Sequence, residues 1–255
     1  FVSCDDGRVT ADGTAKCGLG EMKHSLSYLD GKICGQIETD GMQLGRMLST
    51  DAVGQAAGVA EVDMTLSPDR KHIKTADVDI RLSELAALDH VYRNAQAKLS
   101  AKDGAAQVKV GIAENSASGT IVLNAGDVPA LTGGSSRNGV MAEDVEVVAD
   151  IQHLAPAALN ITDRYGDAVF SGIATIHVDK VTKGMPALAL LDGMQMDIRN
   201  FSIDSEAGRY VCDSLLLTAR KHIGGRREIC LRSDFASVDA TGRFDVKTLP
   251  QSLTN

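Results

Sequence analysis

The sequence predicts an all-β protein, and three observations carry this prediction. Apolar and polar residues alternate in most segments from Val62 onward, short turn sequences separate these segments, and no long amphipathic helix is visible. Because successive side chains of a strand point to opposite faces, each alternating segment gives a strand with one apolar and one polar face. We therefore expect an antiparallel meander with little room for helical crossovers.

The apolar members of these segments are the candidate lining of a hydrophobic groove. Turn signals between them include Asp103-Gly104, Ala207-Gly208, Gly224-Gly225 and Thr241-Gly242, at intervals typical of hairpins. The predicted lining residues are Val62, Met64, Leu66, Val78, Ile80, Leu82, Leu99, Val108, Val110, Ile112, Ile121, Leu123, Val145, Val147, Ile151, Ile176, Val178, Met194, Met196, Ile198, Leu215, Leu217, Ile229, Leu231, Phe244 and Val246.

The two halves of the chain resemble each other. Aligning them at one offset of roughly 118 residues places Asp79 with Asp197, Tyr92 with Tyr210 and Leu99 with Leu217. We expect residues 1–130 to form a first β-groove repeat and residues 131–255 a second one, continuous with the first. The glycine-rich segment Pro129–Asn138 is the predicted boundary between them.

Alternation by itself favours a β-sandwich or a closed barrel, in which a facing sheet fills the core. The long repeat and the aromatic content of only 4% argue against a sandwich or barrel with a filled core. Together with the family resemblance given below, they favour an elongated antiparallel sheet curled into an open, taco-like groove.

Composition excludes several classes of function. The net charge of −8 argues against nucleic acid and against an anionic lipid surface, both of which need basic patches. The five cysteines are odd in number and lack a CxxC spacing, so they indicate neither a disulfide framework nor a zinc site. Cys212 and Cys230 lie in neighbouring predicted strands. The sequence is compatible with a disulfide between them and with two buried free thiols.

No constellation for catalysis emerges from the sequence. Asp77, Asp79 and Glu84 could hold a cation, but they alternate with apolar residues and are more typical of a solvated face. The six histidines show no paired spacing, and phosphate-binding and nucleophile motifs are missing. We therefore expect a protein that is not an enzyme and uses no cofactor or metal.

Several segments resemble a known family. They read ADVDIRLSEL, HVYRNAQAKLSAKDGAAQVKV, SGTIVLNAGD and VEVVADIQHLAPAALNITDRYGDAVFSGIATIHV, followed by the tail DSLLLTARKHIGGRREICLRSDFASVDATGRFDVKTLPQSL. Their order is similar to the periplasmic part of TamB-like and AsmA-like envelope proteins, especially the translocation and assembly module TamB of Bacteroidota. The resemblance extends from about Leu29 to the end, and we expect an internal fragment of such a protein.

The resemblance implies a function and a location. Such proteins are anchored in the inner membrane of Gram-negative bacteria and extend through the periplasm as bridge-like lipid-transfer proteins for outer-membrane biogenesis. The implied partners are phospholipid acyl chains and, through parts outside this chain, an outer-membrane barrel protein; no nucleic acid is expected. A scaffold for assembly or secretion of outer-membrane proteins and a structural β-protein of the cell surface are the alternatives.

Overall fold

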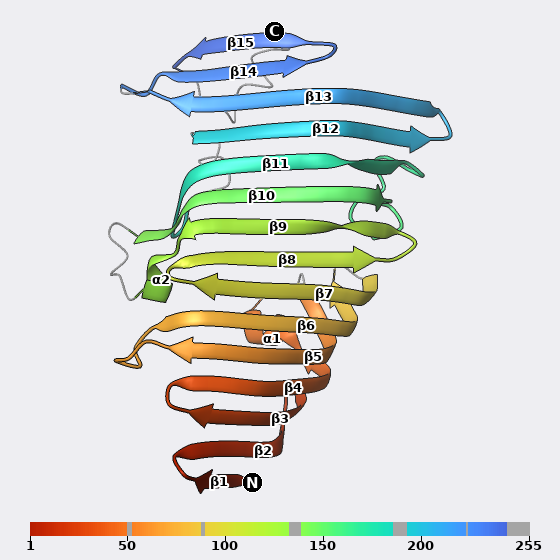
Figure 1. Cartoon of the computed structure of the whole chain (residues 1–255). Coiled ribbons are helices and arrows are strands. Elements are labelled where there is room, and N and C mark those ends of the chain that lie inside the picture. The colour runs from red at the N-terminus through yellow and green to blue at the C-terminus, as the bar shows by residue number, and fades with distance from the viewer. Residues whose placement is uncertain (50–52, 88–89, 133–138, 186–192, 223, 244–255) are drawn as a thin grey trace.

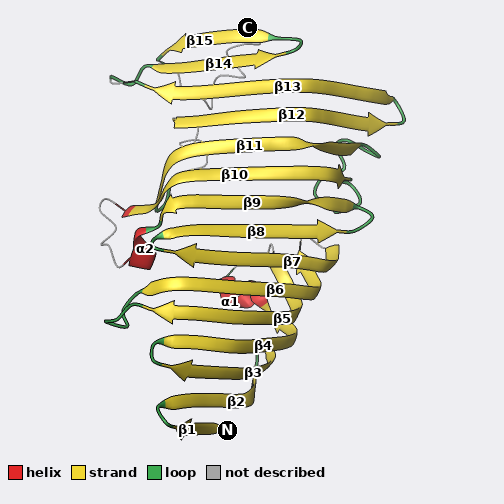
Figure 2. Cartoon of the chain, in the orientation of Figure 1, coloured by secondary structure: helices red, strands yellow, loops and turns green. Residues whose placement is uncertain are grey.

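The computed structural model describes residues 1–255 except 50–52, 88–89, 133–138, 186–192, 223 and 244–255. The described residues form an all-β protein with two short helices, α1 (Leu44–Leu48) and α2 (Pro129–Thr132). Figure 2 shows the strands stacked as the rungs of one ladder. The strands are β1 (Val2–Asp5), β2 (Arg8–Cys17), β3 (Gly20–Leu29), β4 (Lys32–Gln43), β5 (Val53–Leu66), β6 (Ile73–Ala87), β7 (His90–Lys102), β8 (Ala105–Ala113), β9 (Ala117–Asp127), β10 (Val140–Leu154), β11 (Val169–Thr182), β12 (Gly193–Ser205), β13 (Gly208–Lys221), β14 (Arg227–Ser233) and β15 (Ser237–Gly242).

All 15 strands belong to one antiparallel sheet in which each strand pairs with its neighbours in sequence. β1 and β15 are the two edges of the sheet and lie at opposite ends of the molecule (Figure 1). The sheet is therefore a curled, open structure and not a closed barrel. At about 4.8 Å between strands, fifteen strands extend over roughly 67 Å.

Tight hairpins fix the pairing in the first half of the sheet. Asp6-Gly7, Asp30-Gly31 and Asp103-Gly104 each have two residues with positive φ, at 45° and 76°, 48° and 81°, and 49° and 92°. These are the values of two-residue hairpin turns whose twist matches that of the strands, and Asp-Gly is a favoured sequence for them. The turn predicted at Asp103-Gly104 is confirmed, whereas Thr241-Gly242 ends strand β15 and is no turn.

Glycines inside the strands allow neighbouring strands to approach each other closely. At Gly58 of β5, φ is +159°, and a Cβ would lie under 3.0 Å from the carbonyl oxygen of Arg81 in β6. An L side chain would therefore collide with the neighbouring backbone, so only glycine fits at this close approach.

One strand pairing recurs at the offset that relates the two halves of the sequence. In the first half Val78 of β6 lies opposite Leu99 of β7, and in the second half Met196 of β12 lies opposite Leu217 of β13. Both pairs are related by the offset read from the sequence. The predicted boundary at Pro129–Asn138 does not divide the sheet, because β9 and β10 pair directly across it; Pro129–Thr132 form α2, and residues 133–138 lie outside the described part.

Candidate functional site: the apolar face of the sheet

One row of side chains crosses the whole sheet, and we call it the central row. Because paired residues of neighbouring strands share a face, the register aligns one position from every strand. No polar side chain interrupts it. It comprises Val2, Ala11, Leu26, Gly35, Val62, Val78, Leu99, Val108, Leu123, Val147, Ile176, Met196, Leu217, Leu231 and Val238.

Two further apolar rows flank the central row on the same face. The α2-side row contains Met64, Ala76, Ala101, Ala106, Ala125, Val145, Val178, Met194, Ala219, Ile229 and Ala240. The α1-side row contains Ile37, Ala60, Ile80, Ala97, Val110, Ile121, Ala149, Ala174, Ile198 and Leu215. Together the three rows make a continuous apolar face.

The register assigns the sequence-predicted lining residues to this face. Ten of them occupy the central row, and most others stand in the two flanking rows. Leu82, Ile112 and Ile151 lie one step beyond the α1-side row, where they oppose glycines in neighbouring strands. Leu66 ends β5 opposite Ile73, beside an irregular pairing. Phe244 and Val246 lie outside the described residues.

The middle of the apolar face is not covered by any described part of the chain. Ile121 is 43% exposed and Leu123 is 37% exposed, although both lie in the centre of the sheet. Soluble proteins normally cover such a face with a second layer of protein. Large uncovered apolar surface of this kind typically marks a binding surface.

Short segments cover the margins of the face instead. Helix α2 packs against β6 and β10, and Ala76, Ala101 and Ala125 of the α2-side row are buried. At the other margin Leu159, which is only 1% exposed, packs with Tyr92 and Ala117. We call the uncovered middle of this face, between its two covered margins, the gutter; it runs across the strands.

The opposite face carries a matching polar row. It also has one member in every strand: Ser3, Thr10, Ser27, Cys34, Asp63, Asp77, Ser100, Gln107, Asn124, Glu146, His177, Gln195, Thr218, Cys230 and Asp239. In the middle, the Gln107 amide donates to Asn124 Oδ1 at 2.8 Å, and the Asn124 amide donates to Glu146 Oε1 at 3.3 Å. Asp77 and Asp79 are exposed on this face, as the solvated-face interpretation expects.

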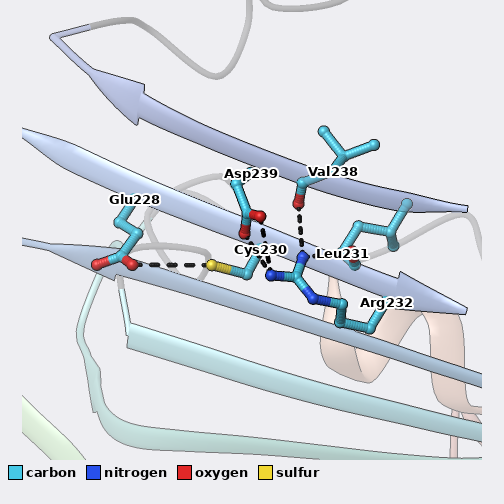
Figure 3. Close-up of polar contacts among 6 residues, drawn as sticks. All are labelled: Glu228, Cys230, Leu231, Arg232, Val238 and Asp239. Atoms are coloured by element: carbon cyan, nitrogen blue, oxygen red, sulfur yellow. Dashed lines mark hydrogen bonds and ion pairs between the residues drawn. The ribbon is translucent and has the colours of Figure 1, made fainter.

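At the β14–β15 end, the polar face holds an ion pair that Figure 3 shows in detail. Arg232 donates from Nη2 to both carboxylate oxygens of Asp239 at 2.7 and 2.9 Å. Its Nη1 donates to the backbone carbonyls of Leu231 and Val238 at 2.9 and 3.1 Å. The hydrogen bonds from Arg232 and then from Cys230 lower the pKa of Asp239. Because Arg232 is in β14 and Asp239 is in β15, the ion pair also links these two strands.

The two cysteines of the C-terminal half do not form a disulfide. All five cysteines are free, and Cys230 lies opposite Thr218, six residues along β13 from Cys212. Six residues of strand span roughly 20 Å, far beyond the reach of a disulfide. Burial and then the hydrogen bond to Asp234 raise the pKa of the Cys212 thiol, which makes it a poor nucleophile.

The described residues provide few features for other chemistry. Within them, no three His, Cys, Asp or Glu side chains gather as metal ligands. None of the helices in this part of the chain has the length and apolar character needed to cross a bilayer.

Sequence reasoning missed the first three strands. β1, β2 and β3 extend the central row by Val2, Ala11 and Leu26. The alternation of Met22, Leu26 and Tyr28 before Asp30-Gly31 was the available signal, and the interruption of the apolar positions by His24 weakened it.

Comparison with known proteins gives no match to this chain, neither among family models nor among curated proteins or solved structures.

Proposed function

We propose that this chain is a periplasmic segment of a bridge-like lipid-transfer protein, and that its apolar face shields phospholipid acyl chains between the inner and outer membranes. The observation that carries the proposal is the central row, which is apolar in all 15 strands and uncovered in its middle. The segments that resemble TamB-like and AsmA-like proteins also support it. In this proposal the protein is anchored in the inner membrane through parts outside this chain, and it catalyses no reaction.

The physical argument concerns the cost of moving a lipid through water. Each methylene group that leaves water for an apolar surface contributes about 0.8 kcal/mol. The central row has no polar interruption and offers nearly the same environment at every strand. An acyl tail can therefore slide along it without losing the free energy gained by leaving water. Between the edge strands, the backbone N–H and C=O groups are hydrogen-bonded within the sheet, so the central row exposes no unpaired backbone group to the tail.

The curled sheet also suits this task geometrically. A strand segment of six residues is about 20 Å long, comparable to an extended acyl tail. The gutter runs across the strands, from edge strand β1 to edge strand β15. Further strands added at either edge would lengthen the gutter without changing its cross-section.

Site-specific photo-crosslinking in cells tests the proposal. A photoreactive residue is placed at Val110, Ile176 or Leu217 on the apolar face, and each has a matched control at the next position on the polar face. The controls are Lys109, His177 and Thr218. We expect phospholipid adducts at the first three positions and none at the controls; crosslinks to protein alone at all three would refute lipid binding.

A scaffold for outer-membrane protein assembly is a second candidate, because the edges β1 and β15 leave backbone groups for pairing with a client strand. A photoreactive residue at Val238 of β15 distinguishes the two proposals. Adducts with unfolded barrel precursors there, combined with no lipid at Val110, Ile176 and Leu217, would favour the scaffold.

A further inference from the structure

Residues 155–168 connect β10 to β11 and lie over the α1-side margin of the apolar face. Leu159 anchors this connection in the buried cluster with Tyr92 and Ala117. The Ala155 amide donates to the carbonyl of Ser116 at 2.9 Å, and Asp167 Oδ2 accepts the Glu206 amide at 2.9 Å. The connection is therefore fixed at its start and its end by contacts with other turns.

A cavity of about 390 Å³ lies between this connection and the ends of β10, β11 and β12. Ala149, Ala174 and Ile198 of the α1-side row form part of its wall, so the cavity is continuous with the gutter. Ile161 and Tyr165 contribute from the connection, and none of the described residues that line the cavity is charged. Its volume is within the range of small-molecule pockets.

Aromatic rings are concentrated at this cavity. The chain has only five phenylalanines and four tyrosines, and three of these nine, Tyr165, Phe170 and Phe201, line it. The Tyr165 and Phe170 rings meet edge to face at 5.3 Å, and Phe170 and Phe201 lie 6.2 Å apart. These ring contacts give the cavity a largely aromatic wall on the side of the connection.

The few polar groups of the wall offer little to a polar ligand. The hydroxyl of Ser171 is bonded to the hydroxyl of Ser202 at 2.8 Å. A phosphate or an amine would lose its hydration here without a charged partner in return. A hydrocarbon chain loses nothing on entering.

We propose that this cavity is a subsite for the methyl end of one acyl chain, which enters from the gutter while the rest of the lipid stays on the three apolar rows. The inference rests on the proposed function and adds a fixed position at which a moving lipid pauses. The 155–168 connection forms the roof of the subsite.

Tryptophan fluorescence tests the subsite, because the chain contains no tryptophan of its own. Three variants, Tyr165→Trp in the cavity, Leu123→Trp in the open gutter and Lys109→Trp on the polar face, each carry one reporter. Each is incubated with vesicles of zwitterionic phosphatidylcholine brominated near the methyl end or near the carbonyl of the acyl chain, because the net charge of −8 disfavours an anionic surface. The protein is separated from the vesicles before the bromine quenching is measured.

We expect methyl-end bromines to quench the tryptophan at 165 at least twofold more than carbonyl-end bromines, and both lipids to quench the tryptophan at 123. Quenching at 123 with none at 165 would overturn the subsite and leave the proposed function standing. Absence of quenching at positions 123 and 165 would overturn the subsite and the proposed function. Equal quenching at the polar-face control, position 109, would show non-specific adsorption and would also overturn the two proposals.

A pocket-filling variant gives a second, independent measurement. Ala174→Phe in the Tyr165→Trp background adds a ring to the cavity wall, and we expect it to abolish the methyl-end quenching. The same change in the Leu123→Trp background should leave quenching there intact. Methyl-end quenching at 165 that survives Ala174→Phe would contradict the subsite. If Tyr165→Trp does not fold, photo-crosslinking from position 161 to the terminal half of a lipid chain replaces the fluorescence measurement.

Discussion

Tyr92 and Tyr210 occupy equivalent places in the two halves of the sheet but differ in their surroundings. Tyr92 lies opposite Leu85 in the β6–β7 hairpin, and Tyr210 lies opposite Ile203 in the β12–β13 hairpin, at the same offset. Tyr92 is 8% exposed and Tyr210 is 62% exposed. The difference arises because Ala117 and Leu159 cover the first ring.

This asymmetry predicts different effects of truncating the two rings. Tyr92→Ala should lower the free energy of unfolding by about 3 kcal/mol, since it leaves a cavity under Leu159. Tyr210→Ala should change it by less than about 0.5 kcal/mol, because the ring is largely in water. Urea unfolding followed by circular dichroism measures both, and equal losses would show that the Tyr92 cluster does not stabilise the margin of the face.

Glycine at position 58 should be required for the close approach of β5 to β6. Gly58→Ala forces a Cβ against the backbone of Arg81, and we expect a loss of roughly 2 kcal/mol in the free energy of unfolding. Gly111→Ala is the matched control, because a Cβ there meets only Thr120 Cγ2 at 3.9 Å. An alanine at 58 as well tolerated as one at 111 would mean that β5 and β6 do not approach each other so closely there.

The Arg232–Asp239 pair predicts that the stability of the folded chain decreases at acid pH. Because the pKa of Asp239 lies below its usual value of 3.8, the folded state binds fewer protons than the unfolded state in this range. The contribution of the pair is present above pH 4 and is lost as the pH falls through the lowered pKa. Arg232→Gln should raise the pKa of Asp239, as measured by the carboxyl carbon shift in NMR titration; an unchanged pKa would show that the pair is broken in solution.

The cysteines should differ in reactivity according to their place in the sheet. Cys4 and Cys17 are exposed, whereas Cys212 is buried and its thiol pKa is raised. At pH 8 we expect iodoacetamide to label Cys212 at least tenfold more slowly than Cys17. Mass spectrometry of timed samples measures this. Equal labelling rates would contradict the burial of Cys212, and a Cys212–Cys230 crosslink would contradict the register.

The amino-acid sequence alone specifies the strand type, many strand positions and the face to which each side chain belongs. Alternation such as Val78, Ile80 and Leu82 decides this locally, since the direction of a side chain in a strand depends only on its position. Asp103-Gly104 likewise specifies its hairpin, because few residue pairs accept two positive φ angles. The offset that relates Leu99 to Leu217 is also visible in the sequence.

The alignment of these strands and the surface that remains uncovered depend on the tertiary structure. Turn geometry and irregular pairings along neighbouring strands set the register, and this register joins Val2 to Val238 in one row. Ile161 and Tyr165 line the same cavity as Ala174, and they belong to a connection whose own sequence has no period of two. Burial is a non-local property, because it depends on which distant segment packs above a side chain, and so the sequence could not separate Tyr92 from Tyr210.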